Sequence, residues 1–319
     1  MTMSHNLLVL QTILAFAFLV LVCLLLKRFE VIREEHGPLF ARLVTEVALP
    51  AVIFSQLATH QINRRQLLLI VAMIVTGCVS LGMAWLAGKI LKEPRTHVGA
   101  LMLSSSFSSS ALIGYPLIQY AFPHNPEALT DAILLSELGV GLPLFTICVV
   151  VAMYFGEGMG EPRSIFQSLR DYLRSPIFVA LVAGLLVSPL GLDPQQPFLA
   201  PFFKTFDMIR DALPLLSCLI LGIQLKYPRV RVLAPLIVMS ALIQLVFQPW
   251  LCNVQASWYQ LSLEQRQVLV LESAMPSAIL PLVFATRYHC APEICASLTF
   301  FNILASVITL PSVFAALGG

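Results

Sequence analysis

The chain has 319 residues, of which 58% are hydrophobic and 11% are charged, and its mean hydropathy is +0.86. This composition excludes a soluble globular domain, because too few polar residues are present to cover a surface in water. The formal net charge is only +2 and no dense block of Lys and Arg is present, which argues against nucleic-acid binding. The sequence therefore predicts an all-α integral membrane protein.

Ten segments of the chain are apolar over roughly the length that crosses the hydrocarbon core of a bilayer. The first carries neither the basic start nor the cleavage site of a signal peptide, so we expect it to be a membrane span. The sixth is the shortest. In chain order, the expected spans are 7–26, 39–58, 66–91, 98–122, 130–154, 176–190, 203–225, 231–251, 267–288 and 293–316.

The longest polar stretch, residues 156–175, separates the fifth expected span from the sixth. Its apolar residues recur at helical spacing, which predicts a short helix lying on the membrane surface. We therefore expect a first five-helix repeat in residues 1–155, a cytoplasmic linker in residues 156–175 and a second five-helix repeat in residues 176–319.

Lys and Arg residues are distributed unequally between the two sets of alternating loops. One set holds 14 of them and the other holds four. Basic loops are retained on the cytoplasmic side of a membrane. We therefore expect a multi-pass protein of the cell membrane with both of its termini outside.

Three short motifs recur in the same order in the two halves of the chain, at offsets of 164, 165 and 168 residues. They fall in the second, fourth and fifth spans of each half. A repeat of five spans inverts the second copy relative to the first, which is the architecture of many secondary carriers. The pairs are Ala48-Leu49-Pro50 with Ala212-Leu213-Pro214, Pro116-Leu117 with Pro281-Leu282, and Leu142-Pro143 with Leu310-Pro311.

The fourth and ninth expected spans contain residues that break helices. The fourth has a serine-rich run from Ser104 to Ser110 followed by Pro116, and the ninth has Pro276 and Pro281. Proline removes a backbone donor and clashes with the preceding turn, so we expect both helices to break and to cross near the midplane. The helix ends exposed there would favour an anion. The alternative is that these residues only kink tightly packed helices.

Two regions of the chain carry a recognisable pattern of motifs. The first is Gly114-Tyr115-Pro116 in the fourth span. The second comprises Met275-Pro276-Ser277-Ala278-Ile279-Leu280-Pro281-Leu282-Val283-Phe284-Ala285, Tyr288, Pro292-Glu293-Ile294 and Leu310-Pro311. This pattern resembles the auxin efflux carrier (PIN-like) family of permeases, which includes bacterial carriers of malonate and related organic anions. The resemblance covers most of the chain and is most specific in these two regions.

The resemblance implies a permease that moves a small organic anion, a malonate-like or auxin-like carboxylic acid, by elevator-type alternating access. It implies a scaffold of spans one, two, six and seven, a transport domain of spans three to five and eight to ten, and a homodimer. Where the family usually carries an asparagine that contacts substrate, this chain has Ser109, whose hydroxyl can still donate to a carboxylate. The expected substrate-binding residues are Ser109, Ser110, Gly114, Tyr115, Pro116, Met275, Pro276, Ser277, Pro281 and Asn302.

Several charged residues fall within the expected spans, where an ionised side chain is costly. Glu46 and Arg210 occupy equivalent positions in the two halves, so they either pair or line an interface. Asp207 and Asp211 bracket Arg210 at the spacing of a local ion pair.

Two further acids, Glu137 and Glu272, fall within the expected transport domain. Burial favours the neutral form of a carboxyl group, so both are candidates to bind a coupling ion, a proton or sodium. The alternative is that they are neutral or hydrogen-bonded acids of the core. Asn302 likewise either faces the substrate or packs between helices.

The seven cysteines lie singly, mostly in apolar segments, and we interpret them as reduced packing residues. Cys290 and Cys295 lie near His289, but the second-helix ligands that a zinc site needs are absent. We expect neither a metal nor another cofactor.

Three other functions compete with an anion carrier. The nearest is a sodium- or proton-coupled cation antiporter, or a bile-acid-type symporter, of related crossed-helix fold; antiporters carry paired carboxylates or Asn-Asp at the crossing, whereas this chain has serines and prolines there. An intramembrane enzyme would need a Gly-x-Ser-Gly, paired aspartates or His-Glu-x-x-His, none of which is present. A channel fits poorly with inverted broken helices. We therefore expect a transporter without enzymatic activity.

Overall fold

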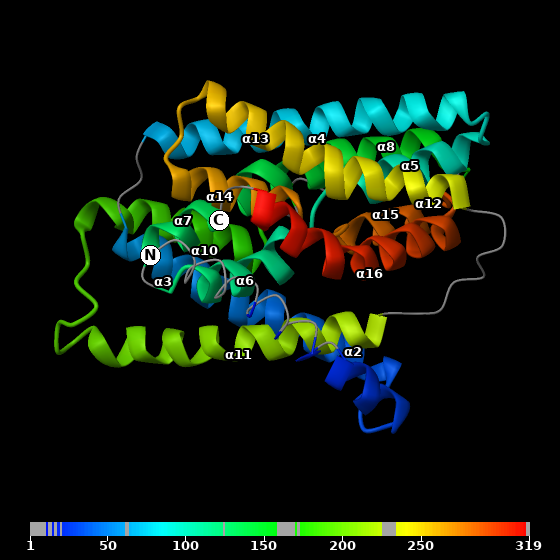
Figure 1. Cartoon of the computed structure of the whole chain (residues 1–319). Helices are drawn as coiled ribbons and strands as arrows, with labels where there is room; N and C mark the ends of the chain where they lie inside the picture. The colour runs from blue at the N-terminus through cyan, green and yellow to red at the C-terminus, as the bar shows by residue number, and fades with distance from the viewer. Residues whose placement is uncertain are drawn as a thin grey trace.

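A computed structural model describes residues 21–60, 64–123, 125–157, 173–224 and 234–316, together with residues 11, 15, 18, 19 and 170. These residues form a bundle of helices (Figure 1). The extended pairing among them is a single antiparallel bridge between Ser108 and Ser277. The all-α class is therefore confirmed. Half of the expected first span and most of the expected surface helix within residues 156–175 lie outside the described residues.

The α-helices differ in length from two turns to seven. In chain order they are α2 (Gly37–Leu43), α3 (Leu49–Thr59), α4 (Arg64–Ile90), α5 (Arg95–Ser106), α6 (Tyr115–Ala121), α7 (Pro126–Leu134), α8 (Val149–Phe155), α10 (Pro176–Val187), α11 (Ala200–Gln224), α12 (Ala234–Ala241), α13 (Gln248–Trp258), α14 (Leu263–Ser273), α15 (Leu280–Arg287) and α16 (Pro292–Ala316). Short 3₁₀ turns are η1 (Glu34–His36) and η6 (Ser188–Leu190), and π-helical segments are η2 (Val44–Ala48), η3 (Ser110–Gly114), η4 (Leu135–Gly141), η5 (Leu144–Cys148) and η7 (Leu242–Phe247).

Within the described residues, five continuous helical stretches are long and apolar enough to cross a membrane. They coincide with the expected spans two, three, five, eight and ten, although the eighth continues to Trp258 instead of ending near residue 251. The stretches are Leu39–Thr59, Arg64–Ile90, Pro126–Phe155, Ala234–Trp258 and Pro292–Ala316. The apolar helix Pro176–Leu190 is shorter and coincides with the sixth expected span. The chain is therefore a multi-pass membrane protein.

Most of the π-helical segments share one sequence feature: η2, η3, η4 and η7 each end two residues before a proline. The residue before that proline donates its N–H to the carbonyl five positions back, as Tyr115 does to Ser110. The proline ring would clash with the carbonyl one normal turn back. Widening the turn by one residue avoids that clash and keeps the backbone hydrogen-bonded where no water is present. These prolines therefore widen a continuing helix.

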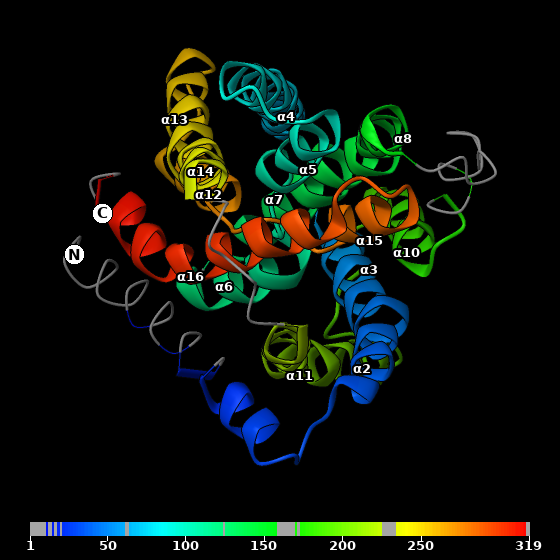
Figure 2. The same ribbon diagram turned by 90° about the vertical axis from the view of Figure 1, so that its right-hand side faces the viewer.

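The helices pack in two groups. Helices α2, α3 and α11 pack together toward the bottom of both views, and α3 packs most extensively against α10 (Figures 1 and 2). The larger group contains α4 to α8 and α12 to α16, which share most of the buried apolar core. Contacts of α3 with α7 and of α11 with α6 join the two groups.

Candidate functional site

Two interrupted helices lie side by side at the centre of the larger group. Helix α5 ends at Ser106 and η3 begins at Ser110; α14 ends at Ser273 and α15 begins at Leu280. The two non-helical segments run antiparallel and share two backbone hydrogen bonds. The N–H of Ser109 donates to the carbonyl of Pro276 at 2.7 Å, and the N–H of Ala278 donates to the carbonyl of Phe107 at 2.8 Å. Segments that are about half the chain apart in sequence therefore meet at their interruptions.

The first interruption is not located at its proline. Phe107 to Ser109 leave the helical conformation, whereas Pro116 stands in the first turn of α6, after the widened η3. The expectation that Pro116 breaks the fourth span was wrong, because a widened turn accommodates its ring and serine side chains favour non-helical backbone. In the second interruption, Pro276 does lie in the break, and Pro281 stands in the first turn of α15.

Buried side chains satisfy the backbone carbonyls that the interruptions leave without helical partners. Asn302 of α16 is fully buried, and its amide donates to Ser277 Oγ at 2.7 Å, to Ser240 Oγ at 2.9 Å and to the Ser104 carbonyl at 3.3 Å. The Ser277 hydroxyl also donates to the Ser104 carbonyl. Asn302 thus holds α5, α12, α16 and the second interruption together.

Two glutamines that were not among the expected site residues also donate to backbone carbonyls at the interruptions. Gln248 donates to the Ser105 carbonyl at 2.8 Å and to Gln244 Oε1 at 3.2 Å. Gln244 donates to the Met275 carbonyl at 3.0 Å. The available signal was a pair of amides four residues apart in the largely apolar eighth span, because polar side chains are rare inside a membrane.

Several polar atoms at the interruptions have no hydrogen-bond partner among the described residues. They are the buried hydroxyls of Ser106 and Ser108 and the side-chain oxygen of Asn302. The Ser109 hydroxyl also makes none of the described hydrogen bonds, although its residue is buried. The helical stretch that begins at Ser110 has first-turn N–H groups without acceptors in their own helix. Such donors suit a ligand with several acceptor oxygens, such as a carboxylate.

A second polar cluster lies along η3 and the start of α6, directly after the first interruption. Ser110 Oγ and Ser136 Oγ are 2.8 Å apart, and the fully buried Tyr115 donates from its hydroxyl to Glu137 Oε1 at 2.6 Å. Tyr115 therefore points toward the fifth expected span. The widened η4 places Ser136 and Glu137 on the side that faces η3.

Glu272 approaches the same turn from α14. It is fully buried, and neither of its carboxyl oxygens has a hydrogen-bond partner among the described residues. A methyl group added to the Cα of Gly114 would overlap both of these oxygens. The absence of a side chain at Gly114 thus makes room for the Glu272 carboxyl group, while Glu137 binds the hydroxyl of the adjacent Tyr115.

The remaining charged residues pair locally. Arg210 contacts Asp207 at 2.9 Å and Asp211 at 3.8 Å, which confirms the expected ion pairs on α11. Glu46 does not pair with Arg210; its carboxylate contacts Arg42 at 3.0 Å, one turn away on the same face. Their equivalent positions in the repeat lie on different helices. Each residue instead pairs with an opposite charge three or four residues away in its own stretch of helix.

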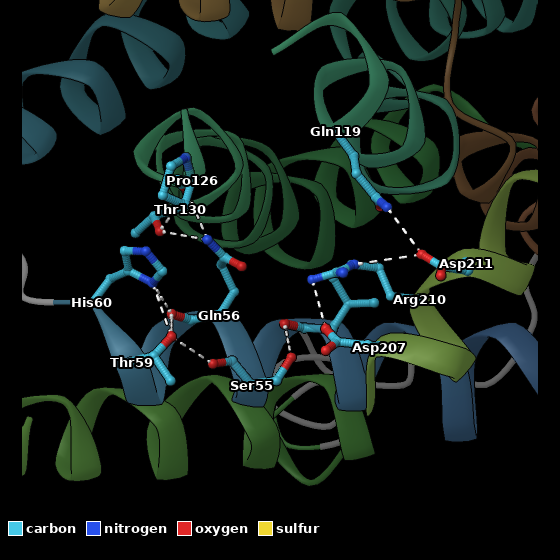
Figure 3. A network of polar contacts seen from close by, with 11 residues as sticks. Ser55, Gln56, Thr59, His60, Gln119, Pro126, Thr130, Asp207, Arg210 and Asp211 are labelled. Carbon is cyan, nitrogen blue, oxygen red and sulfur yellow. Dashed lines mark hydrogen bonds and ion pairs between the residues drawn. The ribbon is translucent and has the colours of Figure 1, made fainter. Parts of the chain in front are cut away.

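Polar contacts also connect the two packing groups (Figure 3). Gln56 of α3 donates to the Pro126 carbonyl at 2.6 Å and to Thr130 Oγ1 at 3.3 Å on α7. Gln119 of α6 donates to Asp211 of α11 at 3.4 Å. These bonds span the boundary between α3 and α11 on one side and α6 and α7 on the other.

A separate cavity of about 350 Å³ lies among η7, α13, α14 and α16. Its lining is mostly apolar and includes Leu245, Trp250 and Val313, but none of the expected substrate-binding residues. Among the described residues, no group of three or more His, Cys, Asp or Glu side chains is arranged to hold a metal ion.

Comparison with known proteins places this arrangement among transporters. A family model described as membrane transport protein matches the chain twice, over residues 8–160 and 160–314. An uncharacterized transporter of Methanocaldococcus jannaschii is 24% identical over 305 residues, covering 94% of this chain and 96% of the relative. An uncharacterized transporter of Methanothermobacter thermautotrophicus is 25% identical, with 94% and 96% covered, and YfdV of Escherichia coli K12 is 22% identical, with 89% and 90% covered. The double match confirms the internal repeat.

Proposed function

The chain belongs to the membrane transport protein family of auxin efflux carrier-like permeases, and from this premise we propose that it is a secondary transporter for a small organic anion, a malonate-like or auxin-like carboxylic acid. The observation that carries the proposal is the pair of interruptions, where the buried hydroxyls of Ser106 and Ser108 have no partner among the described residues. The Ser109 hydroxyl, on a buried residue beside them, makes none of the described hydrogen bonds. Hydroxyl and backbone N–H donors at that point favour an anion over a cation.

The proposed architecture comprises ten spans in two inverted five-helix repeats, with both termini outside the cell membrane and the fourth and ninth helices crossing at their interruptions. Spans one, two, six and seven form a scaffold, and the other spans form a transport domain that carries the anion across by an elevator movement. The close packing of α3 with α10 and α11 supports this division. We further propose a homodimer, as the family resemblance implies.

The membrane potential determines in which direction such a carrier can move an anion without a coupled ion. With the inside negative by about 100 mV, outward movement of a monoanion gains about 2.3 kcal/mol, whereas inward movement costs the same amount. Export can therefore run uncoupled. Net import needs a cation that moves with the anion, and Glu137 and Glu272 are the proposed candidates to bind it, as a proton or sodium.

Replacing Ser109 with alanine is expected to weaken anion binding about tenfold or more, because a hydrogen bond to a charged group contributes about 1.5–3 kcal/mol. Isothermal titration calorimetry, in which a carboxylate that the protein binds is titrated into purified protein, measures this change in affinity. Ser104→Ala is the matched control, since the Ser104 hydroxyl donates back to the Ala100 carbonyl of its own helix at 2.7 Å. Equal affinities in the two variants would remove Ser109 from the binding site.

The function itself is tested by screening purified protein with solid-supported-membrane currents against small mono- and dicarboxylates. A carboxylate response that Ser109→Ala and Pro281→Ala both weaken supports the proposal. Responses to sodium, lithium or potassium alone would contradict it. They would favour the cation antiporter or the bile-acid-type symporter, for which the buried Glu137 and Glu272 are the supporting observation.

The bonds between α3 and α7 must break if the transport domain slides along the scaffold. Gln56→Ala is therefore expected to shift the equilibrium away from the described conformation about fivefold, because one buried hydrogen bond contributes about 1 kcal/mol. Double electron–electron resonance between spin labels on α11 and α8 measures the populations of the two conformations. Ser55→Ala is the control, since its hydroxyl bonds to Val52 within α3. An unchanged distance distribution in Gln56→Ala would argue against a sliding boundary here.

A further inference from the structure

The carboxyl group of Glu272 is buried without a polar partner among the described residues. It is fully buried in α14, both of its oxygens lack hydrogen-bond partners there, and Gly114 leaves it room. Glu137, the other acid at this turn, accepts a hydrogen bond from Tyr115 at 2.6 Å. An ionised carboxylate in such a place has lost its water and gained no donor, whereas a protonated carboxyl group costs far less to bury.

The elements packed against α14 supply no positive charge near this group. Tyr115 of α6 lies near it and donates to Glu137 of η4, Asp131 of α7 accepts from Gln66 at 2.7 Å, and the Cys252 thiol of α13 lies 3.2 Å from Thr76. The basic residues of α4 stand at its two ends, and the acid of α16 stands at its start. These terminal residues are Arg64, Arg65, Lys89 and Glu293.

The anion proposed above would bind at the start of the helical turn whose end, Gly114, lies against this acid. Ser110 begins the turn that ends at Gly114, and the unpartnered hydroxyls of Ser106 and Ser108 precede it. Two negative charges at that separation in an apolar interior repel strongly. An anion bound at the interruptions therefore stabilises the protonated form of Glu272, and by linkage the protonated form binds the anion more tightly.

We propose that Glu272 takes up the proton that travels with the anion, which makes the protein an anion–proton symporter; this inference rests on the proposed function. The proton bonds to one carboxyl oxygen of Glu272, gives a neutral acid, and returns to water with the anion on the other side of the membrane. A monoanion and a proton together carry no net charge, so the membrane potential does not oppose their import. Glu137, held by Tyr115, keeps its charge state through the cycle.

The wild-type chain in detergent provides the first test. Anion affinity is expected to fall as the pH rises, by up to about tenfold per pH unit, the limit for one linked proton. In weakly buffered solution, a pH indicator should record proton uptake on adding the anion. A bound anion without proton uptake at any pH would overturn the inference and leave the proposed function standing. The absence of anion binding at every pH would overturn both.

Two isosteric variants locate the proton. Glu272→Gln is expected to bind the anion with an affinity independent of pH, to lose uptake driven by a pH gradient and to retain anion exchange in proteoliposomes. Glu137→Gln is expected to retain the pH dependence. Glu264→Gln, on the exposed start of the same helix, is the control for transport activity. A wild-type pH profile in Glu272→Gln would overturn the assignment, and its loss in Glu137→Gln alone would transfer it to Glu137.

Discussion

Gly114→Ala is expected to abolish transport and to destabilise the protein by about 1–3 kcal/mol, the usual cost of overfilling a packed interior. The added methyl group would overlap both oxygens of Glu272, which has no room to withdraw because α13 and α7 pack against α14. The variant should still insert into the membrane. Thermal unfolding in detergent measures the stability, and uptake into proteoliposomes measures transport.

Two companion variants show whether the clash with Glu272 is the cause. Gly82→Ala is the control, because a methyl group there meets no atom within 4 Å and lies in the continuous helix α4. The double variant Gly114→Ala with Glu272→Ala should recover most of the lost stability, since the overlapping oxygens are gone, but not proton-driven uptake. Additive losses in the double variant would show that the glycine is needed for some other reason.

Asn302→Ala is expected to cost about 2–3 kcal/mol of stability and to reduce transport at least tenfold. Three buried acceptors, Ser277 Oγ, Ser240 Oγ and the Ser104 carbonyl, lose their common donor, and an unsatisfied buried polar group costs about 1–3 kcal/mol. The second interruption then loses its hydrogen bond to α16. Thermal unfolding without ligand and anion binding together measure the two effects.

Asn253→Ala provides the comparison for Asn302→Ala. Asn253 accepts from Arg266 at 2.6 Å and joins α13 to α14 away from the interruptions, so its loss should leave anion binding intact. The pair also separates the two roles considered for Asn302. If Asn302→Ala unfolds at the wild-type temperature and yet loses anion binding, the amide contacts the substrate and does not brace the backbone.

The length and polarity of each segment determined much of the fold. Residues 66–91 were expected to span the membrane and form α4, Arg64–Ile90, and residues 293–316 form α16, Pro292–Ala316. Span length and apolar composition are properties of a local stretch of chain, so they can be read without knowing its neighbours. The repeat was readable for the same reason, because its motifs return at nearly one offset.

The candidate site was only partly predictable. The sequence identified the fourth and ninth spans as interrupted and named Ser109, Pro276 and Glu272, but it attributed the first interruption to Pro116. The structure places Pro116 in a helix that continues through a widened turn. Whether proline breaks or widens a helix depends on whether neighbouring side chains can satisfy the freed carbonyls, and the local sequence does not contain that information.

The sequence by itself determined that this protein is a helical membrane transporter with two repeats, because hydrophobic length, proline motifs and family pattern are all carried by contiguous residues. Only the tertiary structure decided which polar groups meet. It brought Gln244, Gln248 and Asn302 to the carbonyls of the interruptions and Glu272 to Gly114. In a membrane interior without water, every buried donor, acceptor and charge depends on partners from distant segments, and folding alone determines those partners.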